Sequence, residues 1–154
     1  MENKDKEFLL KAIEKAKESV KKGGFPAGAI VVKEGEIIGS GVSIGNILND
    51  STSHGEMASI RDACNNLNSG NLSGATLYAS MQPCLMCFGA SMWSGISRIV
   101  FACAKDKVSP EYYGGHYKVS EINNDLIRPI KLEQLPELEE ESSALVREWE
   151  KKLK

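Results

Sequence analysis

Two short stretches, Ser53-His54-Gly55-Glu56-Met57 and Gln82-Pro83-Cys84-Leu85-Met86-Cys87, decide how this chain is interpreted. Together they offer one imidazole, two thiolates and one additional carboxylate. Three such nitrogen and sulfur ligands suit a tetrahedral zinc ion whose fourth position is left to water, and a nearby carboxylate suits proton transfer. The first hypothesis is therefore a zinc site with an acid/base group beside it.

The bulk properties fit an ordinary soluble protein. The chain has 154 residues, of which 42% are hydrophobic and 26% are charged, so it is long enough to bury a core. Its net charge of −2 gives no general attraction to nucleic acid or to anionic membranes. We find no secretion signal and no apolar run of the roughly 20 residues that a membrane span needs. We therefore expect one domain over residues 1–154 and a cytoplasmic location.

Hydrophobic periodicity predicts helices that alternate with strands after an opening hairpin. Such an alternation is typical of an α/β sandwich around a mixed sheet. Within the second strand, Gly39 and Gly41 are expected to mark a bulge or a close approach of another backbone. The predicted helices cover 4–22, 54–67, 83–93, 119–127 and 137–153. The predicted strands cover 29–32, 37–42, 75–80, 98–103 and 128–132.

His54 and Glu56 are expected in the first turn of one helix. Because two residues of separation turn their side chains about 200° apart, they cannot both bind one metal from a regular helix. This favours His54 as the ligand and Glu56 as the group that reaches the metal-bound water. Taken alone, His-x-Glu is a weak motif, and a capping histidine followed by a first-turn acid explains it more simply.

Cys84 and Cys87 are expected at the start of the next helix, with Pro83 as its first residue and both sulfur atoms on one side. Their spacing leaves open a redox pair, a closed structural zinc site and an open catalytic site. A closed site needs a fourth protein ligand. The candidates for it are Cys64, Cys103 and His116. Helix geometry directs Cys64 elsewhere and Cys103 is typical of a buried core cysteine, whereas His116, in a glycine-rich loop, remains an alternative.

The combination of His-x-Glu with Pro-Cys-x-x-Cys is far more specific than either half, and it is the signature of zinc nucleobase deaminases. From about Lys11 to Cys103 the chain resembles the cytidine deaminase-like superfamily. Within it, the pattern is similar to the branch of guanine deaminases, yeast-type cytosine deaminases and tRNA adenosine deaminases. The resemblance implies an α/β fold, a three-layer α/β/α sandwich around a mixed five-stranded sheet.

The resemblance also implies the roles of the motif residues. A Zn²⁺ ion would be held by His54, Cys84 and Cys87. Glu56 would be the catalytic residue, carrying protons while water replaces an exocyclic amino group and ammonia leaves. A homodimer is implied as well, and residues 104–154 are expected to form a variable C-terminal lid and helix.

The residues that select the substrate lie outside the two motifs. The branch usually carries an asparagine eleven residues before the zinc histidine, whereas this chain has Ser43 there, with Asn46 or Asn49 as nearby substitutes. Tyr112 and Tyr113 beside two glycines are candidates for a mobile lid, and Trp93 is expected in the core. The predicted substrate-binding residues are Phe25, Ala27, Ser43, Asn46, Tyr112 and Tyr113.

The charge distribution favours a free nucleobase or nucleoside over tRNA, because binding polyphosphate needs several Lys or Arg contacts and no basic cluster accompanies the motifs. Guanine is slightly favoured over cytosine, since the long C-terminal part is similar to that of guanine deaminases. The alternatives are a tRNA adenosine deaminase and a non-catalytic, zinc-stabilised module that binds a nucleotide. We do not expect nucleic acid or a membrane as a partner.

Overall fold

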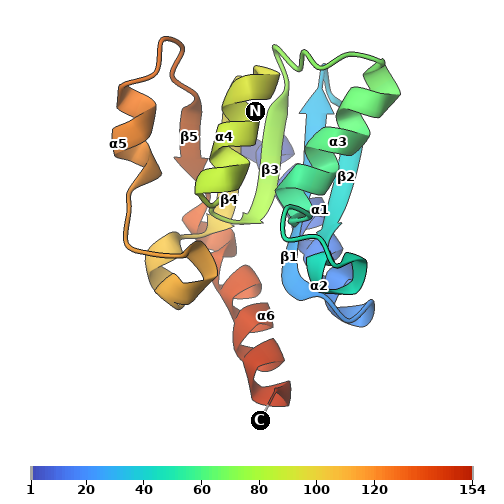
Figure 1. Cartoon of the computed structure of the whole chain (residues 1–154), viewed down its shortest axis with the longest axis vertical. Helices are drawn as coiled ribbons and strands as arrows, with labels where there is room; N and C mark the ends of the chain where they lie inside the picture. Colours follow the sequence, from blue (N-terminus) through green and yellow to red (C-terminus); the bar gives the residue numbers. More distant parts are fainter. Residues whose placement is uncertain (1, 154) are drawn as a thin grey trace.

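The computed structural model describes residues 2–153, which form a five-stranded sheet between two layers of helices (Figure 1). The hairpin strands β1 (Phe25–Lys33) and β2 (Glu36–Ser43) are antiparallel, and β1 is also antiparallel to β3 (Thr76–Met81). β4 (Arg98–Cys103) and β5 (Lys131–Gln134) extend the sheet in parallel, in the order β2-β1-β3-β4-β5. The predicted three-layer sandwich around a mixed five-stranded sheet is therefore confirmed.

Helices cover both faces of the sheet. α1 (Glu2–Lys21) and the start of α6 (Glu139–Lys152) lie on one face, while α3 (Gly55–Leu67), α4 (Leu85–Ser94) and α5 (Val119–Asn124) lie on the other (Figure 1). Within residues 2–153, every helix is too short or too polar to cross a lipid bilayer. Shorter helical segments complete the chain: α2 (Gly45–Leu48) and 3-10 turns at Lys105–Lys107, Pro110–Tyr113 and Pro136–Leu138.

Two hydrophobic cores hold the layers together. Leu9 and Ile13 of α1 pack with Val100 of the inner strand β4 on one face. Ile60 of α3 and Phe88 of α4 belong to the core on the opposite face. Strands β3 and β4 are buried on both faces, which explains why their sequences are continuous apolar runs rather than alternating ones.

α3 lies unusually close to β2. A Cβ atom at Gly39 would come within 2.5 Å of the Ser59 carbonyl oxygen, and one at Gly41 within 2.3 Å of the Gly55 carbonyl oxygen. Only glycine allows this spacing, because it has no side chain to separate the two backbones. The predicted close approach is thus confirmed, and it fixes the position of the N-terminus of α3 against the sheet.

Some predicted boundaries are wrong. Pro83 lies before the helix rather than in its first position, because Cys84 is extended (φ −73°, ψ 175°) and α4 begins at Leu85. The last strand begins at Lys131, after the predicted start at 128, since Pro129 has no N–H to donate to a strand ladder. Residues 45–48 form a helical turn, α2, where the sequence predicted neither a helix nor a strand.

The prediction for Trp93 is also wrong. Its side chain is 85% exposed instead of buried in the core. α4 carries no charged residue, so hydrophobicity alone does not show which of its sides faces inward. The buried side is formed by Cys87, Phe88, Ser91 and Ser94, and Trp93 projects from the opposite side into solvent.

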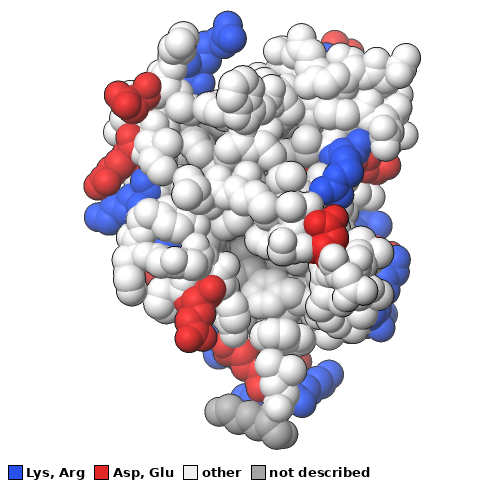
Figure 2. All heavy atoms as spheres, viewed as in Figure 1, with Lys and Arg blue, Asp and Glu red and all other residues white. Residues whose placement is uncertain are grey.

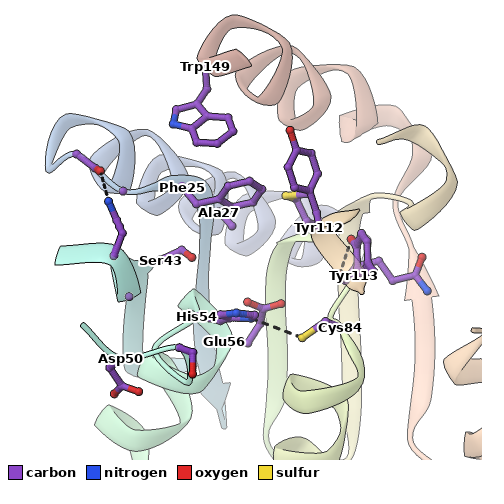
Figure 3. Close-up of a pocket in the computed structure, with 17 residues that line it drawn as sticks. Phe25, Ala27, Ser43, Asp50, His54, Glu56, Cys84, Tyr112, Tyr113 and Trp149 are labelled. Atoms are coloured by element: carbon purple, nitrogen blue, oxygen red, sulfur yellow. Dashed lines mark hydrogen bonds between the residues drawn. The ribbon is translucent and has the colours of Figure 1, made fainter. Parts of the chain in front are cut away.

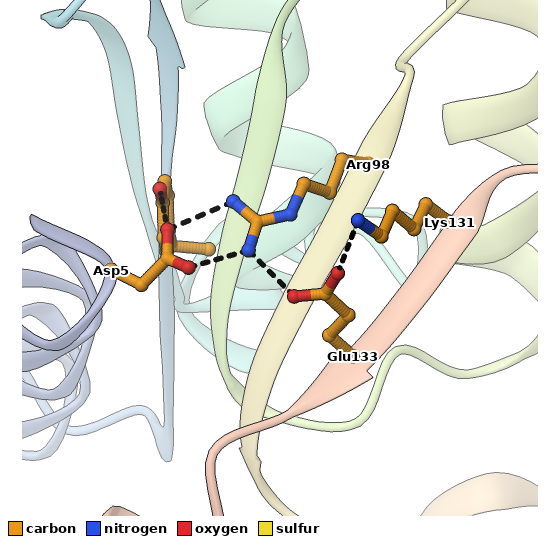
Figure 4. A network of polar contacts seen from close by, with 5 residues as sticks. Asp5, Arg98, Lys131 and Glu133 are labelled. Carbon is orange, nitrogen blue, oxygen red and sulfur yellow. Dashed lines mark hydrogen bonds and ion pairs between the residues drawn. The ribbon is translucent and has the colours of Figure 1, made fainter. Parts of the chain in front are cut away.

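A polar network ties α1 to the sheet on the side away from α3 and α4 (Figure 4). The Arg98 guanidinium donates to both carboxylate oxygens of Asp5, over 2.8 and 2.5 Å, and to Glu133 over 2.6 Å. The Tyr78 hydroxyl donates to the same Asp5 carboxylate over 2.7 Å. These hydrogen bonds, chiefly those from Arg98, hold the pKa of Asp5 below its usual value of 3.8.

We predict that Asp5→Asn lowers the free energy of unfolding by about 2 kcal/mol at pH 7, because it leaves the half-buried Arg98 without its bidentate partner. A lowered pKa stabilises the fold above pH 3.8, and this contribution is lost as the pH falls through the lowered folded-state pKa. Urea unfolding should therefore show a constant gap between the two proteins above about pH 5 that narrows below pH 4. Glu7→Gln, an exposed position of the same helix, is the control, and an equal loss there would contradict the account.

Candidate active site

The two sequence motifs meet at the N-termini of α3 and α4 (Figure 3). His54 directly precedes α3 and Cys84 directly precedes α4, both with extended backbone angles, and neither side chain caps its helix. Glu56 and Cys87 follow in the first turns. His54 is thus outside the helix in which it was predicted, and for this reason His54 and Glu56 can both face the same pocket although they are two residues apart.

The middle residue of the first motif is fixed by packing. A Cβ atom at Gly55 would lie 2.9 Å from the Cα atom of Gly28 in β1, closer than real Cβ contacts come. The two glycines allow the start of α3 to rest directly on β1. His54 and Glu56 are the neighbours of Gly55 on either side. The contact between Gly55 and Gly28 therefore fixes how close both side chains lie to the sheet.

The ligand atoms have the spacing that a tetrahedral zinc ion requires. Zn–S bonds of about 2.3 Å and Zn–N bonds of about 2.0–2.1 Å at tetrahedral angles put sulfur and nitrogen about 3.6 Å apart. The His54 Nδ1 atom lies 3.5 Å from the Cys84 sulfur and 3.6 Å from the Cys87 sulfur. The residues present therefore fit the metal without rearrangement.

Three protein ligands are available to this ion among residues 2–153. The ligand atoms of His54, Cys84 and Cys87 lie within 4.8 Å of one another, and no further His, Cys, Asp or Glu in the described part of the chain joins that group. Cys64 packs with the core beneath α3, the Cys103 thiol is buried and donates to the Ala104 carbonyl oxygen, and His116 is exposed. The arrangement is that of an open site rather than a closed structural one.

The neighbouring groups alter one another's protonation. The neighbouring Cys87 thiol lowers the pKa of Cys84 to about 4, and the Cys84 sulfur in turn raises the pKa of Cys87 well above its usual range. The hydrogen bond to Cys84 also raises the pKa of His54. Burial, followed by the charge of Cys84, raises the pKa of Glu56 to about 7. A divalent cation bound among these residues would act in the opposite direction and release the thiol protons.

A pocket of about 470 Å³ opens above the ligand atoms, a size usual for small-molecule sites. Aromatic side chains form one wall of it (Figure 3). The Phe25 ring lies 5.0 Å from that of Tyr112 and 5.1 Å from that of Trp149, both in edge-to-face arrangements. The Tyr112 hydroxyl donates to Glu150, so this wall joins the loop after β4 to α6.

The opposite wall is polar and carries hydrogen-bond acceptors. Ser43 faces the pocket, and Asn46 donates its amide to the Gly23 carbonyl over 2.9 Å, which leaves the amide oxygen free to accept. Thr52 donates its backbone N–H and its hydroxyl to one oxygen of Asp50, over 2.9 and 2.6 Å. These bonds lower the pKa of Asp50, so its carboxylate is ionised at neutral pH.

All six predicted substrate-binding residues line this pocket, and so do three of the four motif residues that carry the chemistry. Cys87 lies buried behind them. Sequence reasoning missed Trp149 and Asp50. Lining residues outside the prediction are Gly23, Gly24, Gly45, Asp50, Ser51, Met81, Gln82 and Trp149.

Comparison with known proteins identifies the family. Residues 2–103 match the model for the cytidine and deoxycytidylate deaminase zinc-binding region. This chain belongs to that family. The resemblance inferred from the two motifs and the zinc cofactor are thereby confirmed.

Individual relatives divide between two substrate classes. The tRNA-specific adenosine deaminase of Aquifex aeolicus is 40% identical over 152 residues, 97% of this chain and 96% of the relative. The guanine deaminase of Bacillus subtilis is 35% identical over 117 residues, 75% of each chain. The crystal structure of guanine deaminase from Nitrosomonas europaea superposes with a TM-score of 0.81 at 25% identity, covering 92% of this chain and 82% of that one. Membership in the family therefore leaves the substrate undecided, and the expectation that nucleic acid is no partner is not confirmed.

Proposed function

We propose that this protein is a zinc-dependent hydrolytic deaminase that acts on a free nucleobase or nucleoside. One observation carries the proposal: the Glu56 carboxylate, 6% exposed, lies at the floor of a pocket together with an open three-ligand zinc site. A purely structural zinc site has no need of an additional buried acid, whose desolvation is costly. The combination argues for chemistry at this point.

The proposed reaction replaces an exocyclic amino group by a carbonyl oxygen. When bound, zinc supplies a water molecule of lowered pKa as the nucleophile. Glu56 would take one proton from the attacking water while the water oxygen bonds to the ring carbon, and would deliver this proton to the neighbouring ring nitrogen. It would then move the proton that remains on the added hydroxyl to the amino group, so that the C–N bond breaks, ammonia leaves and the C=O bond forms.

The walls of the pocket suit a flat, nitrogen-rich ring. The edge-to-face rings of Phe25, Tyr112 and Trp149 offer an aromatic surface to a heterocycle. On the other side, Ser43 faces the pocket with its hydroxyl and Asn46 offers its amide oxygen as an acceptor. Guanine has two ring N–H groups besides its reacting amine and cytosine has one, so an acceptor-rich wall supports guanine as the favoured base.

A tRNA adenosine deaminase is the second candidate, favoured by the Aquifex aeolicus relative. The charges near the pocket weigh against it. Among the described residues, the pocket lining includes no Lys or Arg but does include Asp50. Helix α6, which contributes Trp149 to the pocket, has Glu139, Glu140 and Glu141 in its first turn and Lys151 and Lys152 in its last turn, so it adds no net positive charge. Neutralising a phosphate backbone needs several cationic contacts, which this lining does not offer.

We predict that Glu56→Gln keeps one zinc ion per chain and lowers kcat by about 10²–10⁴-fold, the usual contribution of a positioned acid/base group. Metal content by atomic absorption and ammonia release measured on the same sample would check both statements. Undiminished turnover in the variant would refute the assigned role of Glu56.

The substrate class is tested by ammonia release from guanine, guanosine, cytosine and adenine, with an adenosine-containing tRNA anticodon stem-loop as the competing substrate. We expect turnover of guanine or its nucleoside, no inosine in the stem-loop, and no salt-sensitive binding of it at low ionic strength. Inosine formation would support the tRNA candidate. Tight zinc with no ammonia from any compound would point to a non-catalytic binding module.

We further propose that the protein forms a homodimer through the outer side of α4. This helix has no charged residue, and its outward side exposes Leu85 and Trp93. Figure 2 shows this face as largely uncharged, with charges around its edge and a hollow between α2 and α6 where the pocket opens. In a two-fold dimer a patch meets itself, so the absence of charge avoids like-charge repulsion and suits a second copy of the chain.

Trp93→Lys should shift the protein to monomers, because it places two like charges next to each other across the two-fold axis. Sedimentation velocity over a concentration series would measure this, with Ile37→Lys, an exposed apolar position on the edge strand β2, as the control that stays dimeric. A wild-type protein that sediments as a monomer at all concentrations, or a dimeric Trp93→Lys variant, would contradict the interface.

A further inference from the structure

The segment that carries Cys84 is held at both ends by two tyrosine hydroxyls from the loop after β4. The Tyr113 hydroxyl donates to the Gln82 carbonyl oxygen over 2.7 Å. The Tyr117 hydroxyl accepts the N–H of Leu85 over 2.9 Å. Cys84 lies between these two points, so the loop contacts the zinc-binding segment directly before and directly after the ligand.

Lys105 holds the two tyrosines in place. Its ammonium group lies 4.6 Å from the centre of the Tyr117 ring and 5.3 Å from that of Tyr113, distances at which a cation is attracted to an aromatic face. It also donates to the Gly115 carbonyl between them over 2.7 Å. The Lys105 backbone N–H donates to the Gln82 side chain over 2.9 Å. The loop is thereby fastened both to itself and to the segment before Cys84.

These contacts compensate for a missing cap. The first N–H groups of a helix have no partner within the helix, and the residue before it usually supplies an acceptor side chain. Cys84 occupies that position but makes no side-chain cap, which leaves its sulfur available to a metal. Tyr117 supplies an acceptor from outside to the first N–H of α4. The Tyr113 side chain is buried and packed on its neighbours, so its hydrogen bond to the Gln82 carbonyl oxygen holds the Gln82 backbone in place.

We propose that Tyr113 and Tyr117, oriented by Lys105, are positioning residues that hold Cys84 at the distance from His54 that zinc requires. The inference depends on the zinc site that the family implies. Only the kcat measurement in its test depends on the proposed deamination. It also gives residues 105–117 a role different from that of a mobile lid, since their tyrosines are anchored beneath the pocket rim. Tyr117 is the clearer probe, because it does not line the pocket, whereas Tyr113 does.

The test compares Tyr117→Phe with Tyr78→Phe. Each variant loses one tyrosine hydroxyl, but that of Tyr78 bonds to Asp5 on the other side of the sheet. Zinc affinity is measured by competition with a chromophoric chelator, and ligand geometry by the visible absorption of the Co²⁺-substituted proteins. We expect Tyr117→Phe to weaken zinc about 10–100-fold and to shift the cobalt bands, as loss of groups that orient metal ligands does. Tyr78→Phe should lower stability without changing either readout.

Turnover and a second variant complete the test. With a substrate in hand, Tyr117→Phe should lower kcat and leave KM unchanged, because substrate does not contact Tyr117. If Tyr117→Phe does not fold, Lys105→Met carries the same prediction and Lys105→Arg, which keeps the cation, should restore zinc affinity. Wild-type zinc affinity and cobalt bands in both Tyr117→Phe and Lys105→Met would overturn the inference. Because the metal readouts need no substrate, they decide it even if no base is deaminated.

Discussion

Three ligand atoms at the N-terminal ends of two helices have to lie about 3.6 Å apart before this protein can hold a tetrahedral zinc ion. The two helices reach that point only because each is pressed onto the sheet. α3 rests on Gly39 and Gly41 of β2, and its first residue rests on Gly28 of β1. Phe88 anchors α4 in the same core. The geometry of the metal site therefore depends on glycines in β1 and β2, which let the backbone of α3 come close to the sheet.

The same geometry separates the chemical roles. A residue just before a helix has extended backbone angles, and a residue in the first turn does not, so neighbours in sequence can approach one pocket from different directions. His54 is the residue just before α3, and Glu56 lies in the first turn of α3. Cys84 and Cys87 repeat this pattern at α4. The C-terminal part of the chain then encloses the site, with Trp149 and Tyr112 above it and the Lys105 loop beside it.

The sequence alone predicted the order of helices and strands and the four motif residues, because periodicity and ligand spacing are local signals. It predicted the six pocket residues through resemblance and position. It could not place Trp93, since α4 is apolar on every side and only the tertiary structure shows which side is covered. Asp50 and Trp149 were missed as pocket residues because they are far apart in the sequence and come to line one pocket only through the tertiary fold. The contacts of Tyr113 and Tyr117 likewise depend on hydrogen bonds between segments about thirty residues apart.

The coordination of zinc in the purified protein is the most direct test of this account. Zinc K-edge X-ray absorption should show two sulfur atoms at about 2.3 Å, one imidazole and one further light atom without imidazole scattering, the signature of a site with an open position. Three sulfur atoms, or two imidazole rings, would mean that Cys64, Cys103 or His116 closes the site. Either result would contradict a catalytic zinc centre held by His54, Cys84 and Cys87.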